Sequence, residues 1–159
     1  MSEVISRSND RNIFAIGSAH FSTMQQYYSN IKHLSDVNYK VFSQTGEDGI
    51  IDYLVYSLNI KKPKFVEIGV GVYRESNTRF VFEKTSCQGL IIDVVDNLEK
   101  KVRDNIKFWK GDLTVVEKEI NSENIIETLN KENFYKDIDL FSIDIDGIDY
   151  WVLEKLPIT

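Results

Sequence analysis

The chain of 159 residues contains a single cysteine, two prolines and no excess of basic charge. A lone Cys87 excludes an internal disulfide and indicates a reducing compartment, where we expect it to be a small packed residue. The net charge of −6 argues against a nucleic-acid surface, because phosphate binding needs a basic footprint. No apolar run has the length of a membrane span, and the first residues show no signal-peptide pattern. We therefore expect a cytoplasmic protein that binds neither nucleic acid nor membrane.

Several common ligand-binding patterns are also missing. No G-x-x-x-x-G-K-[ST] occurs, which argues against a nucleoside triphosphatase. The glycines Gly69 and Gly71 do not extend to G-x-G-x-x-G, because Arg74 occupies the third position, and this argues against a nicotinamide enzyme. The two histidines, His20 and His33, have no carboxylate or cysteine neighbours at metal-ligand spacing, so we expect no metal site.

The rest of the chain is organised around residues 64–72 (KFVEIGVGV). A short apolar run that ends in a turn is typical of a buried parallel strand. Gly69 and Gly71 allow a sharp turn and a close approach of the backbone to a ligand. The polar residues 74–78 offer helix caps before the next apolar segment. Together these features predict a βα unit that can bind a ligand.

Strands and helices are expected to alternate along the chain, which predicts an α/β fold with a doubly wound, mostly parallel sheet. We expect an N-terminal arm and helix over 1–40, in which residues 1 to about 17 are loose and 19–34 are helical. A single domain is expected over 41–159. Its predicted strands are 64–69, 89–95, 106–109 and 138–147, and its helices fall near 50–58, 76–85, 97–103, 122–129 and from 149.

Acidic residues recur where these strands are expected to end. Glu67 lies within the first strand, Asp93 is at the end of the second, Asp112 follows the third, and Asp144 and Asp146 end the fourth. In an open α/β sheet these ends form the ligand crevice, where an acid after the second strand binds ribose hydroxyls. Strand periodicity would put Asp144 and Asp146 on one side. Acids on successive strands favour a ligand with several hydrogen-bond donors, such as ribose hydroxyls and an ammonium group.

Residues 43–49 (SQTGEDG) are unusually polar for a helix start. They could cap the helix through Ser43 or Thr45, with acids near its positive end. Alternatively, they could form a polar lip over the ligand site. The sequence leaves both interpretations open.

Residues 65–71 (FVEIGVG) resemble the first motif of class I S-adenosylmethionine-dependent methyltransferases, and the chain as a whole resembles the FkbM-like methyltransferases. Further similarity lies at 43–49, 75–79 (ESNTR) and 142–151 (SIDIDGIDYW). The resemblance implies a Rossmann-like methyltransferase fold with S-adenosylmethionine as cofactor. By the resemblance, Glu67, Gly69 and Gly71 border the methionine end of the cofactor, Asp93 binds the ribose, Asp112 lies near the adenine and Asp144 lies beside the sulfonium. Gln44 is a further candidate cofactor-binding residue.

Two features depart from this family pattern. Ile148 replaces a polar residue expected in the D-G-x-D-Y-W block. The family fold implies seven strands ordered 3-2-1-4-5-7-6, whereas this sequence stops where the fifth would begin, so the later strands are expected to be missing. The fourth strand would then be an apolar edge, which is an aggregation hazard unless it is covered. We expect the N-terminal helix, a second copy in a homo-oligomer or another chain to cover it.

Three functions are compatible with these residues. The leading hypothesis is a methyltransferase that methylates a hydroxyl of a sugar or small molecule, with Asp144 and Asp146 as candidate catalytic bases. A second is a methyltransferase-like module without turnover that binds a nucleoside ligand or a partner chain. A third takes Asp144-Ile145-Asp146 as the metal-binding Asp-x-Asp of a glycosyltransferase.

Overall fold

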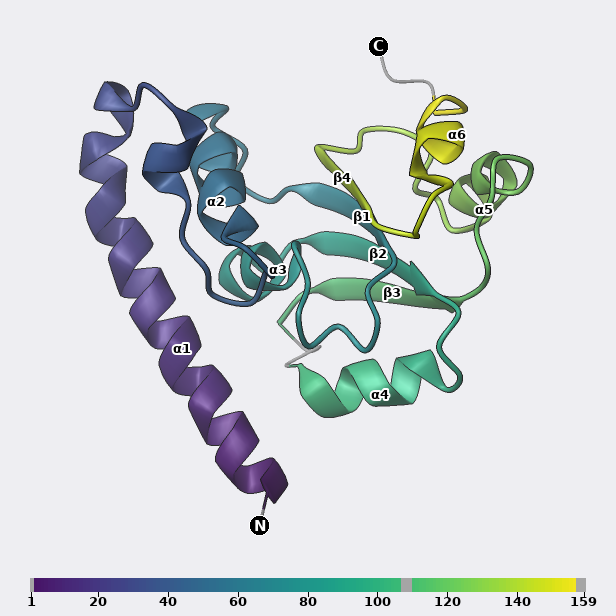
Figure 1. Ribbon diagram of the computed structural model, residues 1–159, viewed down its shortest axis with the longest axis horizontal. Coiled ribbons are helices and arrows are strands. Elements are labelled where there is room, and N and C mark those ends of the chain that lie inside the picture. Colours follow the sequence, from purple (N-terminus) through teal and green to yellow (C-terminus); the bar gives the residue numbers. More distant parts are fainter. Residues whose placement is uncertain (1, 107–109, 157–159) are drawn as a thin grey trace.

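The computed structural model describes residues 2–106 and 110–156, with side chains from residue 9 onward (Figure 1). Within these ranges, helices and strands alternate as the sequence predicts. The strands are β1 (Lys64–Ile68), β2 (Gln88–Asp93), β3 (Asp112–Glu117) and β4 (Leu140–Ile143). The helices are α1 (Ser2–Met24), α2 (Glu47–Ser57), α3 (Arg79–Thr85), α4 (Leu98–Asn105), α5 (Ile125–Lys131) and α6 (Asp149–Leu153), with 3₁₀ turns η1 (Gln25–Asn30) and η2 (Leu34–Val37).

The four strands form one parallel sheet in the order β3-β2-β1-β4. β1 pairs with β2 on one side and with β4 on the other, and β2 pairs with β3. The chain therefore moves outward from β1 to β3 and then returns to the other side of β1. This reversal makes the sheet doubly wound, as predicted, and creates a topological switch point between β1 and β4.

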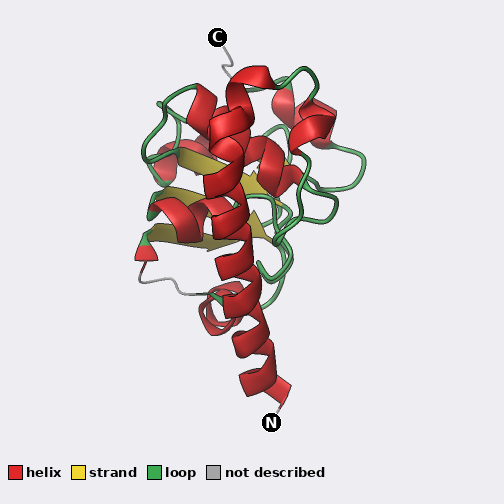
Figure 2. Cartoon of the chain, turned by 90° about the vertical axis from the view of Figure 1, so that its left-hand side faces the viewer, coloured by secondary structure: helices red, strands yellow, loops and turns green. Residues whose placement is uncertain are grey.

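The alternation of side chains along the strands builds a hydrophobic cluster on each face of the sheet. Phe65 and Ile91 face one side, where they pack with residues of α3 and α4 around the buried Cys87. Val66 and Leu90 face the other side, where they pack against α5 and α6. Figure 2 shows helices on both sides of the strands. Glu67 shares the face of Phe65, so its carboxylate lies under the segment that leads into α3.

The N-terminal segment is more regular than expected, because residues 2–17 belong to α1 rather than to a loose arm. The helix ends at Met24 and is followed by η1, so the helix expected over 19–34 stops early. α1 runs along the side of the molecule formed by α2 and α3 (Figures 1 and 2). Phe21 packs against Phe80, and Asp10 forms an ion pair with Arg79. These tertiary contacts hold α1 against the rest of the molecule.

The third strand differs from the prediction. Apart from Ile106, which follows α4, the strand expected over 106–109 lies outside the described residues. The strand that pairs with β2 is 112–117, and Asp112 is its first residue, aligned with Gln88. Because the strands are parallel, Asp112 lies at the amino edge of the sheet, whereas the ligand crevice of such a fold lies at the carboxyl edge. The expectation that Asp112 follows a strand is therefore wrong.

β4 lies at an edge of the sheet, because within the described residues it pairs with β1 on one side and with no strand on the other. The N-terminal helix packs on α3, so it is not placed to cover this edge as the sequence analysis suggested. Coverage by a second copy or by another chain stays a prediction. Among the described helices, none combines the length and the apolar character that a membrane crossing requires.

Candidate functional site

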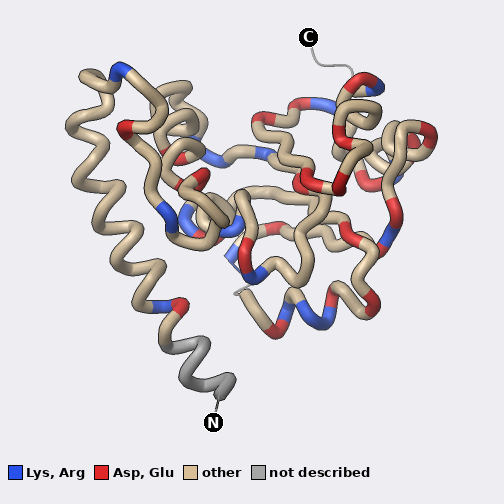
Figure 3. The backbone as a smooth tube through the Cα atoms, viewed as in Figure 1, with Lys and Arg blue, Asp and Glu red and all other residues tan. Residues whose placement is uncertain are grey.

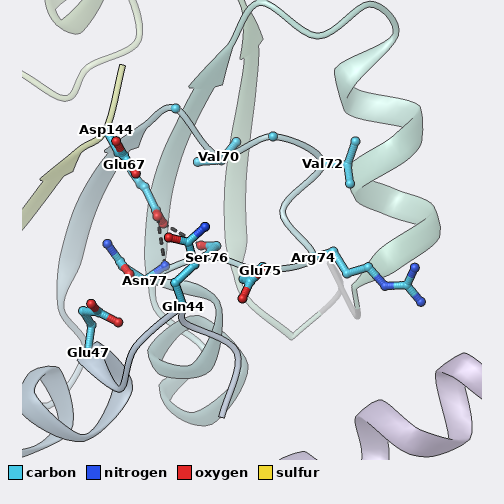
Figure 4. Close-up of a pocket in the computed structure, with 12 residues that line it drawn as sticks. Gln44, Glu47, Glu67, Val70, Val72, Arg74, Glu75, Ser76, Asn77 and Asp144 are labelled. Carbon is cyan, nitrogen blue, oxygen red and sulfur yellow. Dashed lines mark hydrogen bonds between the residues drawn. The ribbon is translucent and has the colours of Figure 1, made fainter. Parts of the chain in front are cut away.

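A cleft of about 340 Å³ opens at the carboxyl ends of β1 and β4, which is the switch point of the sheet. Two segments surround it: the lip, defined as residues 41–47, and the β1–α3 loop, residues 69–78 (Figure 4). Twelve residues line the cleft: Gln44, Glu47, Glu67, Gly69, Val70, Gly71, Val72, Arg74, Glu75, Ser76, Asn77 and Asp144. Its volume is in the range of small-molecule sites.

Glu67 forms the floor of the cleft and is 4% exposed. One oxygen accepts hydrogen bonds from the Ser76 hydroxyl at 2.6 Å and from the Thr78 amide at 3.0 Å and hydroxyl at 2.5 Å. The other accepts the Asn77 amide at 2.9 Å (Figure 4). Residues 76–78 were expected to cap α3, but no side-chain cap forms there, since these groups donate to Glu67 instead. The carboxylate therefore fixes the end of the β1–α3 loop.

Gly69 brings the two central strands together at the cleft. Its φ is +85°, and a Cβ at this position would lie 1.9 Å from the carbonyl oxygen of Asp144. The Asp144 amide in turn donates to the Ile68 carbonyl at 3.0 Å. Only glycine permits this approach, which holds Asp144 at the cleft, where its exposed side chain forms part of the lining.

Asp93 acts through Gly71 rather than by lining the cleft. Its Oδ2 accepts the Gly71 amide at 2.7 Å, and its Oδ1 accepts the Val95 amide at 3.1 Å. The carboxylate at the end of β2 thus holds the glycine turn after β1. The expected position of Asp93 at the end of the second strand is confirmed, and its contact with a ribose stays a prediction.

The lip combines both roles that the sequence allowed. Ser43 Oγ accepts the Asp48 amide at 3.2 Å, which satisfies one free N–H group of the first turn of α2. Gln44 and Glu47 line the cleft, as a polar lip would. Glu47 also accepts hydrogen bonds from the Thr45 hydroxyl and amide and from the Gly46 amide. These bonds fold the lip back onto the first turn of α2.

The hydrogen bonds to Glu47 predict a pH-dependent contribution to stability. Burial alone raises the pKa of Glu47, but the bonds from Thr45 and neighbouring amides outweigh it and lower the pKa from 4.5 to about 2. Because the folded-state value is lower, this contribution is complete above pH 4.5 and is lost as the pH falls toward 2. The difference in unfolding free energy between wild type and Glu47→Gln, from urea titrations, should therefore shrink between pH 6 and pH 3. A difference that is constant with pH would contradict this assignment.

The structure brings most of the predicted site residues together. Gln44, Glu67, Gly69, Gly71 and Asp144 all line the cleft. Their contact with a cofactor stays a prediction.

Apart from Asp93, two predicted site residues lie outside the cleft lining. Asp112 is at the opposite edge of the sheet, where it accepts a hydrogen bond from the Gln88 side chain at 3.1 Å. Asp146 is not part of the cleft lining. β4 ends at Ile143, so strand periodicity does not reach Asp146, which has a φ of +48° in the turn before α6. The strand periodicity that would put Asp144 and Asp146 on one side therefore does not apply to them.

The charge of the cleft is predominantly acidic. Glu47, Glu67, Glu75 and Asp144 line it, together with Arg74. Figure 4 shows the guanidinium of Arg74 directed away from Glu67, and Figure 3 shows further acidic residues along the turn that follows β4. Among the described side chains, no group of three or more His, Cys, Asp or Glu residues is arranged to hold a metal ion. The cleft therefore suits a ligand that carries positive charge and hydrogen-bond donors.

Several lining residues were not singled out as site residues by the sequence. Arg74, Glu75, Ser76 and Asn77 belong to the loop that was expected to supply helix caps. The Asn77 side chain donates to the Ser142 hydroxyl at 3.1 Å and so joins this loop to β4. The available signal was the density of polar residues directly after the glycine turn.

Comparison with known proteins identifies no family for the chain. No known family matches its sequence, and no solved structure matches it either. A stretch of 73 residues is 34% identical to Reticulocyte-binding protein homolog 1 of Plasmodium falciparum. This stretch covers 42% of the present chain, and the chain spans only 2% of the length of that protein. So small a share shows no common family or function.

Proposed function

We propose that the protein is a methyltransferase of the S-adenosylmethionine-dependent type, and that its cleft binds this cofactor. The observation that carries the proposal is the position and charge of the cleft. It lies at the switch point between β1 and β4, where doubly wound α/β proteins bind nucleotides, and its lining contains four carboxylates and one arginine. A sulfonium and an ammonium group on a nucleoside are complementary to such a lining. The sequence resemblance at residues 65–71 supports the same ligand.

The reaction best supported by the resemblance is methylation of a hydroxyl on a sugar or small molecule. The cofactor, when bound, supplies the methyl group, which leaves its sulfur as a bond forms to the acceptor oxygen. Asp144 is the candidate base for the proton of that hydroxyl, because it lines the cleft and its side chain is exposed. Asp146 is less suited to this role, since it is not part of the lining.

Cofactor binding can be tested by calorimetry with S-adenosylmethionine and S-adenosylhomocysteine. Replacing Asp144 with asparagine should weaken S-adenosylmethionine binding on the order of tenfold, because a carboxylate beside the cation is lost. Asp146→Asn is a matched control in the same turn, and asparagine tolerates its positive φ. This control should bind as wild type does. Absence of binding to both compounds, or equal losses in the two variants, would refute the proposal.

A module that binds a nucleoside without turnover is the alternative. The edge position of β4 favours it, because the strand that leads to Asp144 pairs with β1 alone in the described sheet. Binding of S-adenosylmethionine without methyl transfer to any of a panel of sugars and alcohols would support this alternative. The Asp-x-Asp glycosyltransferase is disfavoured, since Asp144 lines the cleft and Asp146 does not.

A further inference from the structure

Asp48 accepts four hydrogen bonds beside the cleft, although it is not part of the lining. It lies in the first turn of α2 and is 1% exposed. Its Oδ2 accepts the backbone amides of Val41, Phe42 and Ser43, each at 2.7 Å, and the Ser43 hydroxyl at 2.8 Å. Its buried Oδ1 has no hydrogen-bond partner in the part of the chain that the structure describes. All four donors therefore converge on one oxygen.

Three consecutive amides directed at one carboxylate oxygen define the backbone path of residues 41–43. Hydrogen bonds to an ionised acceptor are shorter and stronger than neutral ones, and successive N–H groups form a concave site for an anion. In this protein the anion in that site is the carboxylate of Asp48. The start of the lip is consequently held by a single side chain.

The same segment continues into the floor of the cleft. The Phe42 carbonyl accepts the Ser76 amide at 3.1 Å, and the Ser76 hydroxyl donates to Glu67 at 2.6 Å. The guanidinium of Arg79, which is buried, lies 3.8 Å from the centre of the Phe42 ring. A continuous series of hydrogen bonds thus runs from Asp48 through residues 41–43 and Ser76 to Glu67 on β1.

The far end of the lip is part of the cleft wall. Gln44 and Glu47 contribute to the lining directly. The Lys40 ammonium donates to the Gln44 carbonyl and to Glu75, each at 3.0 Å, which ties the lip to the opposite loop. A displacement of residues 41–43 would therefore move both walls of the cleft.

We propose that Asp48 is a positioning residue, which sets the geometry of the cleft by clamping residues 41–43 and, through Ser76, the β1–α3 loop. Its effect on ligand affinity rests on the proposed function, whereas its effect on the backbone does not. If Asp48 had a purely structural role, replacing it would have the same effect as replacing any other buried acid of α2. Asp52, one turn further along the helix, provides that comparison, because it is buried and bonds Tyr28 and Lys84 rather than the lip.

The test compares Asp48→Asn with Asp52→Asn in the full chain. Backbone hydrogen exchange is measured at residues 41–43 and 76–78, with the amides of β2 as an internal reference. For Asp48→Asn, we expect exchange at both segments to rise about tenfold relative to β2, because charge-assisted bonds are lost. Asp52→Asn should leave this ratio unchanged. Ser43→Ala, which removes the hydroxyl donor and keeps the amides, serves as a milder variant if Asp48→Asn does not fold.

The affinity for S-adenosylhomocysteine provides the second readout. Asp48→Asn should weaken it about tenfold, and Asp52→Asn should leave it unchanged. A rise in exchange that is uniform across the chain, or equal in the two variants, would overturn the proposal. Faster exchange at both segments without any loss of affinity would also overturn it, as the cleft would then be independent of the clamp. If the wild type binds no S-adenosylhomocysteine, the proposed function fails, and exchange alone decides whether Asp48 holds the two segments.

Discussion

Replacing Gly69 with alanine should destabilise the protein by about 4 kcal/mol, a large part of the stability of an ordinary domain. The new Cβ would lie 1.9 Å from the Asp144 carbonyl oxygen and 2.7 Å from its carbonyl carbon. Both are backbone atoms of a segment hydrogen-bonded to Ile68, so neither can rotate away as a side chain could. The φ of +85° adds strain for any residue with a Cβ. Urea unfolding measures the loss.

Gly71→Ala is the matched control for this substitution. Gly71 also has a positive φ, of +56°, but a Cβ there would have no neighbour within 4 Å. Only the conformational cost of about 1 kcal/mol should appear. Equal losses in the two variants would mean that the approach of Gly69 to Asp144 makes no separate contribution to stability.

Removal of the Glu67 carboxylate should have an effect of similar size, with a loss of about 3 to 5 kcal/mol for Glu67→Ala. The substitution leaves the Ser76 hydroxyl, the Asn77 amide and both donors of Thr78 without their acceptor. Thr78 is fully buried, so water cannot readily replace the lost oxygens. Thermal unfolding followed by circular dichroism should show a midpoint lowered by roughly 10 °C.

Glu75→Ala tests whether the burial of Glu67 is responsible. Glu75 also lines the cleft, but its side chain is 52% exposed and bonds only Lys40 among the contacts described. Its replacement should change stability by no more than about 0.5 kcal/mol. A comparable loss in both variants would contradict the assignment of Glu67 as the anchor of the β1–α3 loop.

Strands with continuous apolar runs could be predicted from the sequence, and the third strand could not. The interior residues of 64–68 and 88–93 are buried on both faces, and apart from Glu67 they carry no polar side chain. β3 reads DLTVVE, with acids at both ends, and its central residues are only partly buried. The third strand was instead predicted in the more aromatic segment just before it. A lateral strand has less need of apolar side chains on both faces, which weakens its signal.

The sequence predicted the glycine turn of the candidate site, but it did not predict which groups form hydrogen bonds there. Gly69 and Gly71 follow an apolar strand, and that order predicts a sharp turn at the end of the strand. The acceptor for residues 76–78 is Glu67, which lies on the strand before the turn, so the short polar run was instead interpreted as helix caps. Asp48 was likewise expected to interact with the helix end, whereas its donors precede the helix. The direction in which a polar side chain bonds depends on tertiary structure.

The position of β1 between β2 and β4 also constrains the order in which the protein can fold. Its pairing with β2 joins residues about one βα unit apart, but its pairing with β4 joins distant segments, as in the bond from the Lys64 amide to Asp139 across 75 residues. Closing so long a loop is entropically unfavourable until other contacts have formed, and such non-local pairing slows folding. The Asp144 carbonyl, which leaves no room for a Cβ at Gly69, takes up its position only when β4 pairs with β1. During synthesis, the glycine turn therefore exists before its cleft, and a chain that has formed β1 to β3 has yet to acquire the cleft.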